Sequence, residues 1–180
     1  MQSPLHPDVE LVRDSLADGP PAWRCPASGG VWIDGTDYQA WRERHWKLQE
    51  PEASPGEDMS DSDSPAGKRC PVDGRFLIRH QVGHGLDFHI DLCNACGGLW
   101  LDAGEWQALR ARDLQDDLTR VFTSAWQAAL RRERAAQAER DRLKERLGAE
   151  DFERFAAFVD WLDAHPHRSA LLAYLRSPRS

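Results

Sequence analysis

The sequence has few cysteines, no long apolar run and a deficit of positive charge. No stretch of its 180 residues approaches the roughly eighteen consecutive apolar residues of a membrane-spanning helix. The first thirty residues lack the cationic start, apolar run and small-residue cleavage site of a signal peptide. We therefore expect a cytoplasmic protein that has no membrane partner.

The cysteine count is 4, and the cytoplasm keeps thiols reduced. A closely spaced pair in such a chain indicates a metal site or a redox-active site more readily than a disulfide framework. Three of the four, Cys70, Cys93 and Cys96, are placed to share one site, and Cys25 lies apart from them.

Lysine and arginine total 23 against 30 aspartate and glutamate residues, which gives a formal net charge of −7. Proteins bind nucleic acid or anionic membrane over a broad surface through clustered Lys and Arg side chains, because these release counterions. The overall balance argues against that mode of binding and leaves open a local basic patch.

A segment rich in proline, serine and acid divides the chain. Residues 50–67 contain no basic side chain and almost nothing apolar to bury, a composition typical of a disordered linker. We therefore predict an N-terminal module in residues 1–49, this acidic linker, a second module in residues 68–112 and a helical region in residues 113–180.

The two predicted modules repeat one pattern at an offset of 68 residues. Residues 25–41 match residues 93–109 with 8 identities in 17 positions, so two copies of one module are the economical interpretation. Further upstream, the His-Pro dipeptide at residues 6–7 is the best match for the Cys-Pro dipeptide at residues 70–71.

Strands and a short helix are expected in the second module. Residues 86–92 alternate apolar and polar side chains with the period of a half-buried strand. Residues 76–81 would be its hairpin partner, across a glycine-containing turn. Asp102 followed by Glu105 resembles a capping box, so a short helix should follow there.

Longer helices are expected after residue 113, where apolar residues recur at the helical period. The first continues through a charged stretch as far as Gly148, a suitable residue beyond a helix C-terminus. Residues 150–164 and 169–176 predict two more helices. The fold class is therefore α+β, with two small zinc-ribbon-like hairpin-plus-helix modules, one of them degenerate, followed by a C-terminal helical region.

The Cys93–Asn–Ala–Cys96 spacing suits a zinc knuckle, because two intervening residues let both thiolates face one point. The glycines at 97 and 98 let the backbone curl around the sulfurs. A second knuckle starts at Cys70, where Asp73 takes the place of its second thiol. The predicted Zn²⁺ ligands are therefore Cys70, Asp73, Cys93 and Cys96.

Alternatives remain for this site. His80, His84 and His89 compete with Asp73 for the fourth ligand position, and spacing favours Asp73. Cys93 and Cys96 alone could instead be a redox pair.

The first copy carries fewer ligands. Cys25 is followed by Ser28 where the second thiolate should stand, and only His6 and Asp8 could substitute upstream. We expect this copy to fold without metal and to replace it with buried tryptophan side chains such as Trp32 and Trp41.

The run from Cys70 to Leu109 resembles a bacterial zinc-finger family named for its similarity to transcription factor IIB. The tail at residues 100–105, Trp-Leu-Asp-Ala-Gly-Glu, is the most specific part of the resemblance. The resemblance implies that Zn²⁺ is held by Cys70, Asp73, Cys93 and Cys96. It implies little about function, because a shared fold does not define an activity.

We expect a non-catalytic, structural-zinc interaction protein whose partner is another protein or a second copy of the chain. No nucleophile–base pair, phosphate loop or His-Glu zinc helix points to an enzyme. The alternative is nucleic-acid or transcription-complex binding through the ribbon and an Arg-rich helix, whose intervening acids favour a solvated face instead. The Arg-rich series comprises Arg131, Arg132, Arg134, Arg140, Arg142, Lys144 and Arg146.

Overall fold

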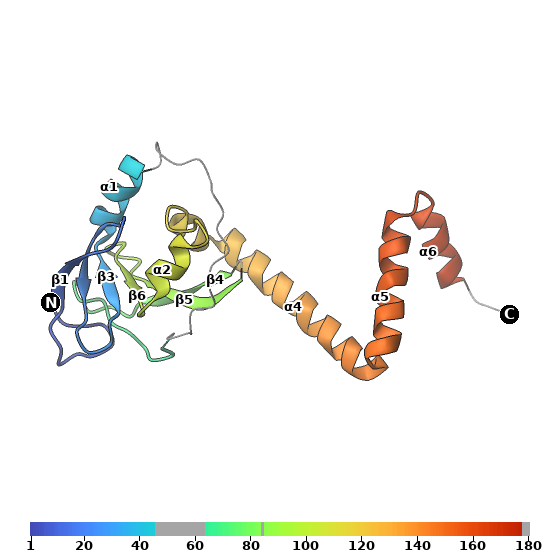
Figure 1. Ribbon diagram of the computed structural model, residues 1–180, viewed down its shortest axis with the longest axis horizontal. Coiled ribbons are helices and arrows are strands. Elements are labelled where there is room, and N and C mark those ends of the chain that lie inside the picture. The colour runs from blue at the N-terminus through green and yellow to red at the C-terminus, as the bar shows by residue number, and fades with distance from the viewer. Residues whose placement is uncertain (46–63, 84, 178–180) are drawn as a thin grey trace. The chain divides into compact units, whose positions relative to one another are not determined.

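The computed structural model describes residues 1–45, 64–83 and 85–177 (Figure 1). Most of the acidic segment, residues 50–63, lies outside the described residues, as does His84. The chain divides into two compact units, Met1–Leu130 and Arg131–Ser180. The first contains a six-stranded antiparallel sheet with helices and the second is helical, so the α+β prediction is confirmed.

The sheet has the strand order β1-β2-β3-β6-β5-β4, and every pair of neighbours is antiparallel. The first three strands come from the N-terminal stretch and the last three from the second module, so the order is symmetric about the β3–β6 pair. Residues 1–45 and 64–112 thus build one continuous sheet. The strands are β1 (Val12–Ser15), β2 (Pro21–Arg24), β3 (Val31–Ile33), β4 (Ile78–Gly83), β5 (Leu86–Leu92) and β6 (Leu99–Leu101).

At the centre of the sheet, Trp32 of β3 lies opposite Trp100 of β6. Both indole rings are fully buried. A Cβ atom on Gly30 would overlap the Trp100 ring, and one on Gly98 would overlap the Trp32 ring. Each repeated Gly-Gly-x-Trp segment therefore makes room for the tryptophan of the other.

Side-chain alternation along these strands creates two cores, one on each face. The helix-side core contains Val31 and Ile33 of β3, and the knuckle-side core contains Trp32 between them. The helix-side core also includes Leu99, Leu101, Tyr38, Trp41, Trp106, Leu109, Leu118 and Val121. The knuckle-side core consists of Leu11, Cys25, Trp32, Cys70, Leu77, Cys93 and Trp100.

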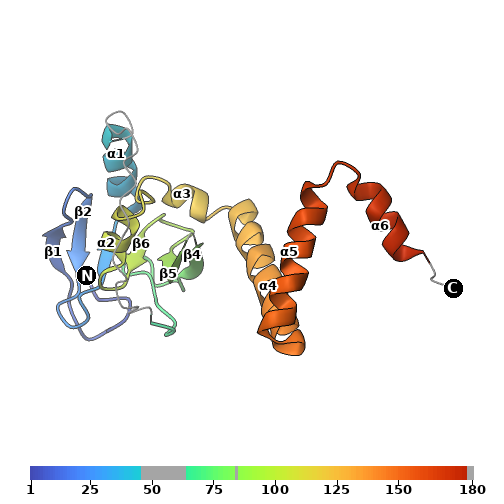
Figure 2. The same ribbon diagram turned by 45° about the vertical axis from the view of Figure 1, so that its right-hand side comes forward.

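Two helices of equivalent position cover the helix-side core, namely α1 (Gly35–His45) after β3 and α2 (Glu105–Arg110) after β6 (Figure 2). Their rings meet, because Trp41 and Trp106 pack edge to face with centroids 5.5 Å apart. The expected capping interaction is present in part. The Asp102 amide donates to Glu105 Oε2 over 2.7 Å, whereas the Asp102 carboxylate turns away from the helix to accept from the Trp100 indole.

Backbone hydrogen bonds correct the pairing of residues 6–7 with residues 70–71. Ser3 N donates to Val9 O over 2.8 Å, as Cys70 N donates to Arg75 O over 2.7 Å. The amides of residues 5 and 6 donate to Ser3 Oγ, as those of residues 72 and 73 donate to Cys70 Sγ. Ser3 therefore stands in the Cys70 position. The N-terminal loop is one residue longer, which hid this register in the sequence.

The helix expected to run on from residue 113 is interrupted. It begins with α3 (Leu118–Val121) and restarts as α4 (Ser124–Leu147). Thr123 separates the two, because its hydroxyl donates to Arg120 O over 2.7 Å and accepts from Trp126 N over 3.3 Å. This side chain thus ends one helix and caps the next.

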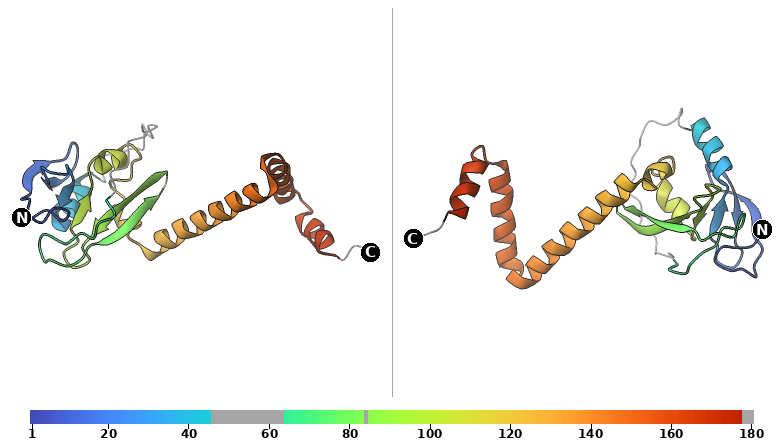
Figure 3. Two further views of the ribbon diagram at one scale, coloured as in Figure 1. Left: turned by 90° about the horizontal axis from the view of Figure 1, so that it is seen from below. Right: turned by 180° about the vertical axis from the view of Figure 1, so that it is seen from behind.

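The second unit contains the distal part of α4, then α5 (Ala149–Ala164) and α6 (Arg168–Arg176), close to the predicted helical ranges (Figure 3). Gly148, with φ 81°, is the single residue between α4 and α5. None of the described helices combines the length and the apolar content that a membrane-spanning helix requires.

Candidate metal centre

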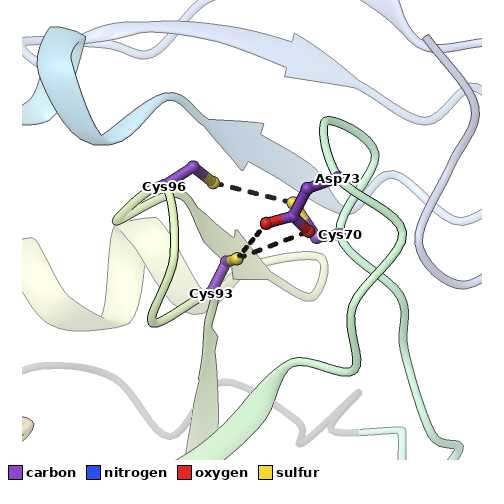
Figure 4. A group of neighbouring side chains, drawn as sticks. All are labelled: Cys70, Asp73, Cys93 and Cys96. Atoms are coloured by element: carbon purple, nitrogen blue, oxygen red, sulfur yellow. Dashed lines mark hydrogen bonds between the residues drawn. The ribbon is translucent and has the colours of Figure 1, made fainter.

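Two loops bring the four predicted ligand residues together on the knuckle side of the sheet (Figure 4). Cys70 and Asp73 belong to the loop before β4, and Cys93 and Cys96 belong to the turn between β5 and β6. One ligand atom from each of the four residues lies within 4.8 Å of the others.

The distances within the cluster suit a tetrahedral ion. Cys70 Sγ lies 3.6 Å from Cys96 Sγ, and Cys93 Sγ lies 3.4 Å from Asp73 Oδ2. Zinc–sulfur bonds of about 2.3 Å and zinc–oxygen bonds of about 2.1 Å place tetrahedral ligands about 3.6–3.8 Å apart. A Zn²⁺ ion therefore fits the donor set with small adjustments.

The two loops share one backbone conformation, which is what points their ligands inward. Gly74 N donates to Cys70 O over 2.9 Å, and Gly97 N donates to Cys93 O over 2.8 Å. Both glycines have φ near 70°, namely 74° and 70°, a conformation that glycine adopts without strain. The Cys93 loop closes again where Cys93 N donates to Gly98 O over 2.9 Å.

The protonation of the cluster reflects its surroundings. Burial raises the pKa of the Cys70 thiol to about 12 and also raises the pKa of Cys96. A hydrogen bond from the Arg75 amide lowers the pKa of Asp73. Zinc binds thiolates, so an ion entering this site would displace the thiol protons.

Two of the three competing histidines, His80 and His89, lie elsewhere, and the third, His84, is outside the described residues. The half-buried His80 ring packs edge to face on Phe122, with centroids 5.1 Å apart. His89 lies against Arg79, with 3.2 Å between its Nδ1 and the guanidinium. Neither belongs to the four-residue cluster.

The N-terminal stretch contains a loop with the same backbone hydrogen bonds but with different side chains. Cys25 N donates to Gly30 O over 2.8 Å, as Cys93 N does to Gly98 O, and Gly29 N donates to Cys25 O over 2.8 Å. Burial tends to raise the pKa of the Cys25 thiol, but hydrogen bonds with Ser28 and Ser3 leave it lowered. In the described ranges, the Cys70 cluster is the one group of three or more potential metal ligands.

Sequence reasoning missed a buried ion-pair network beside the site. Lys68 Nζ lies 2.6 Å from Asp91 Oδ2 and 3.2 Å from Asp102 Oδ2, and it also donates to Ser64 O over 3.2 Å. All three charged side chains are almost fully buried. The sequence carried one indication of this network, since Lys68 and Asp91 each stand two residues before a cysteine of the cluster.

Comparison with known proteins agrees with this centre. Residues 69–112 match the model of the transcription factor zinc-finger family, a zinc ribbon of the transcription factor IIB type. This match confirms the resemblance for that stretch alone, which is less than half of the chain. No curated protein and no solved structure matches the chain significantly.

Proposed function

We propose that the chain is a non-catalytic interaction protein in which one structural Zn²⁺ ion holds residues 68–112 together. The observation that carries the proposal is the convergence of Cys70, Asp73, Cys93 and Cys96 within 4.8 Å. Four protein ligands complete a zinc tetrahedron and leave no open position, as in structural sites. The ion would cross-link the loop before β4 to the turn after β5.

Packing around the cluster supports a structural role. A Cβ atom on Gly35, at the start of α1, would overlap the backbone of Cys96 and Gly97. The N-terminal part of the chain thus lies directly against a zinc loop, and Cys70 and Cys93 belong to the knuckle-side core. Binding zinc to this core would therefore stabilise both halves of the sheet.

We further propose that residues 1–45 are a degenerate copy of the ribbon that folds without metal. Ser3, His6, Cys25 and Ser28 take the places of Cys70, Asp73, Cys93 and Cys96 in the backbone pattern. Hydrogen bonds of Ser3 and Ser28 with the Cys25 thiol replace metal bonds, and the buried Trp32 supplies apolar packing.

The partner is proposed to be a protein, because large apolar side chains are exposed on the helical second unit. Phe155, Phe158 and Trp161 of α5 expose 42–51% of their surface. Nucleic acid is the second candidate, motivated by the exposed basic side chains of α4. Acidic neighbours dilute that charge, as in the 3.6 Å Arg142–Glu139 ion pair.

Elemental analysis of freshly purified, reduced protein tests the zinc proposal. We expect one equivalent of Zn²⁺, lost with part of the folded structure on chelation. Cys93→Ala should abolish binding, whereas the matched variant Cys25→Ala should keep one equivalent. Protein that holds no metal would refute the proposal, and equal zinc loss from both variants would refute the assignment of the ion to the second copy.

The class of partner is tested separately by affinity purification of the tagged full chain at low salt, with and without nuclease. Partners that persist after nuclease treatment support protein binding. Retention on DNA or RNA that weakens steeply with salt would favour the alternative.

A further inference from the structure

The second unit buries very little of its apolar surface. Among the described residues 131–177, Phe152 and Leu162 are the only buried side chains, each 6% exposed. Ordering each residue costs about 1–2 kcal/mol of backbone entropy, and most of the stability of helices in proteins comes from tertiary packing of an amphipathic face. Two buried side chains do not offset that cost, so the unit requires a further packing surface.

Helix α5 carries most of the apolar side chains that a further packing surface would cover. Its apolar residues Phe152, Phe155, Val159 and Leu162 follow one another at spacings of three, four and three, the a/d pattern of a helix that packs along another helix. Phe152 and Leu162, at the two ends of this row, are buried within the chain, whereas Phe155 between them is 45% exposed. Phe158 and Trp161 widen this face, with ring centroids 5.8 Å apart. We call this surface the α5 face.

The distal half of α4 leaves most of the α5 face uncovered within the same chain, since Phe155, Phe158 and Trp161 are 42–51% exposed. Residues 131–147 are exposed almost throughout, and the Arg140 guanidinium of α4 contacts α5 near the junction of the two helices, 5.1 Å from the Phe152 ring centroid. Gly148 alone connects the helices, which is fewer than the two to five residues of a helical hairpin.

The two helices carry opposite charge. Residues 131–147 contain seven basic and four acidic side chains, a net charge of +3, whereas α5 contains five acidic side chains and one basic, a net charge of −4. A helix suited to lie beside α5 therefore exists on this chain, and a second copy can supply it. Such an arrangement is reciprocal, as two-fold dimers require.

We propose that the chain forms a homodimer through its second unit, in which the basic distal half of α4 from each copy lies along the acidic α5 helix of the other and the two α5 faces are buried together. This proposal rests on the proposed interaction function, and it identifies the protein partner as a second copy of the chain. It is independent of the zinc site.

The test is sedimentation equilibrium of the zinc-loaded full chain over about 1–100 μM, where weak dimers dissociate. Three charge-reversed proteins are compared with the wild type. The α4 variant carries Arg142→Glu, Lys144→Glu and Arg146→Glu. The α5 variant carries Glu153→Arg, Asp160→Arg and Asp163→Arg. The third protein combines both sets.

We expect twice the chain mass for the wild type, and a dissociation constant raised about tenfold or more by either reversal alone, because like charges then face each other. The combined protein should recover the dimer. A matched control makes the same charge change as the α5 variant on the first unit and should leave the dimer intact. It carries Asp8→Arg, Glu10→Arg and Glu43→Arg.

A wild type that is monomeric at every concentration would overturn the proposal, whether the α5 face then binds another protein, nucleic acid or the first unit. A dimer unaffected by both reversals, or a combined protein that stays monomeric, would overturn it as well. Helix content by circular dichroism shows that each variant folds. Zinc content, measured on the same samples, separates failure of this inference from failure of the zinc proposal.

Discussion

The ammonium group of Lys68 lies 2.6 Å from the carboxylate of Asp91, and both side chains are closed to solvent. Lys68 precedes the first cysteine loop and Asp91 lies in β5, just before the second. The pair therefore ties together the two segments that carry the candidate zinc ligands. Burial raises the pKa of Asp91 while the Lys68 hydrogen bond lowers it, and burial prevails, so the carboxylate depends on its partner to stay charged.

Replacing Lys68 by Met should lower the free energy of unfolding by about 3–5 kcal/mol, because it leaves two buried carboxylates uncompensated. Denaturant unfolding in excess zinc measures this change. The control Arg44→Met removes an exposed cation on α1 and should change stability by less than about 0.5 kcal/mol. Equal effects from the two variants would show that the buried network contributes nothing specific.

Gly98→Ala should destabilise the sheet by about 1–3 kcal/mol, because the added methyl group overlaps the buried Trp32 ring. Gly67→Ala is the control, since its Cβ would approach nothing nearer than 3.9 Å. Thermal or denaturant unfolding of the zinc-loaded proteins compares them. Gly98→Ala with wild-type stability would mean that the reciprocal Gly–Trp packing is loose.

Asp73→Ala should weaken zinc binding by at least about tenfold, the lower bound for the loss of even an outer-shell partner of a metal site. His89→Ala should leave zinc affinity unchanged, because His89 lies outside the ligand cluster. Competition with a chromophoric chelator measures both affinities. If the His89 variant loses zinc and the Asp73 variant keeps it, the fourth ligand has been misassigned.

The double substitution Ser3→Cys with Ser28→Cys should raise zinc content from one to two equivalents. It places two thiols beside Cys25, with which both serines already form hydrogen bonds, and His6 stands in the position of Asp73. Elemental analysis of the folded protein measures the stoichiometry. One equivalent in a folded double variant would argue that the first loop, although equivalent in its hydrogen bonds, cannot hold an ion.

The elements that sequence reasoning predicted well have local causes. Strand β5 has the predicted bounds because its alternation reflects one buried and one exposed face. The helices α5 and α6 begin within one residue of expectation. The interruption at Thr123 was missed, because a hydroxyl that bonds to neighbouring backbone is favourable in many contexts and is not diagnostic in a sequence.

The candidate site likewise contains residues that a local pattern predicted and residues that only the fold brought together. Cys93 and Cys96 could be paired from a spacing of three residues, which fixes their geometry locally. The choice of Asp73 over His80, His84 and His89 rested on spacing alone, and the fold placed Asp73 beside the thiols because Gly74 turns its loop back. Ser3 escaped notice because the matching loop differs in length by one residue.

The sequence by itself determined the candidate ligand residues, the repeated pattern of residues 25–41 and 93–109, and the helical character of the C-terminal region, since composition and short-range spacing control each of these. Only the tertiary structure decided that the two segments join through Trp32 and Trp100 into one sheet, and that Lys68 is buried between Asp91 and Asp102. Those relationships connect residues far apart in the chain, and their free energies depend on burial that no local pattern reports.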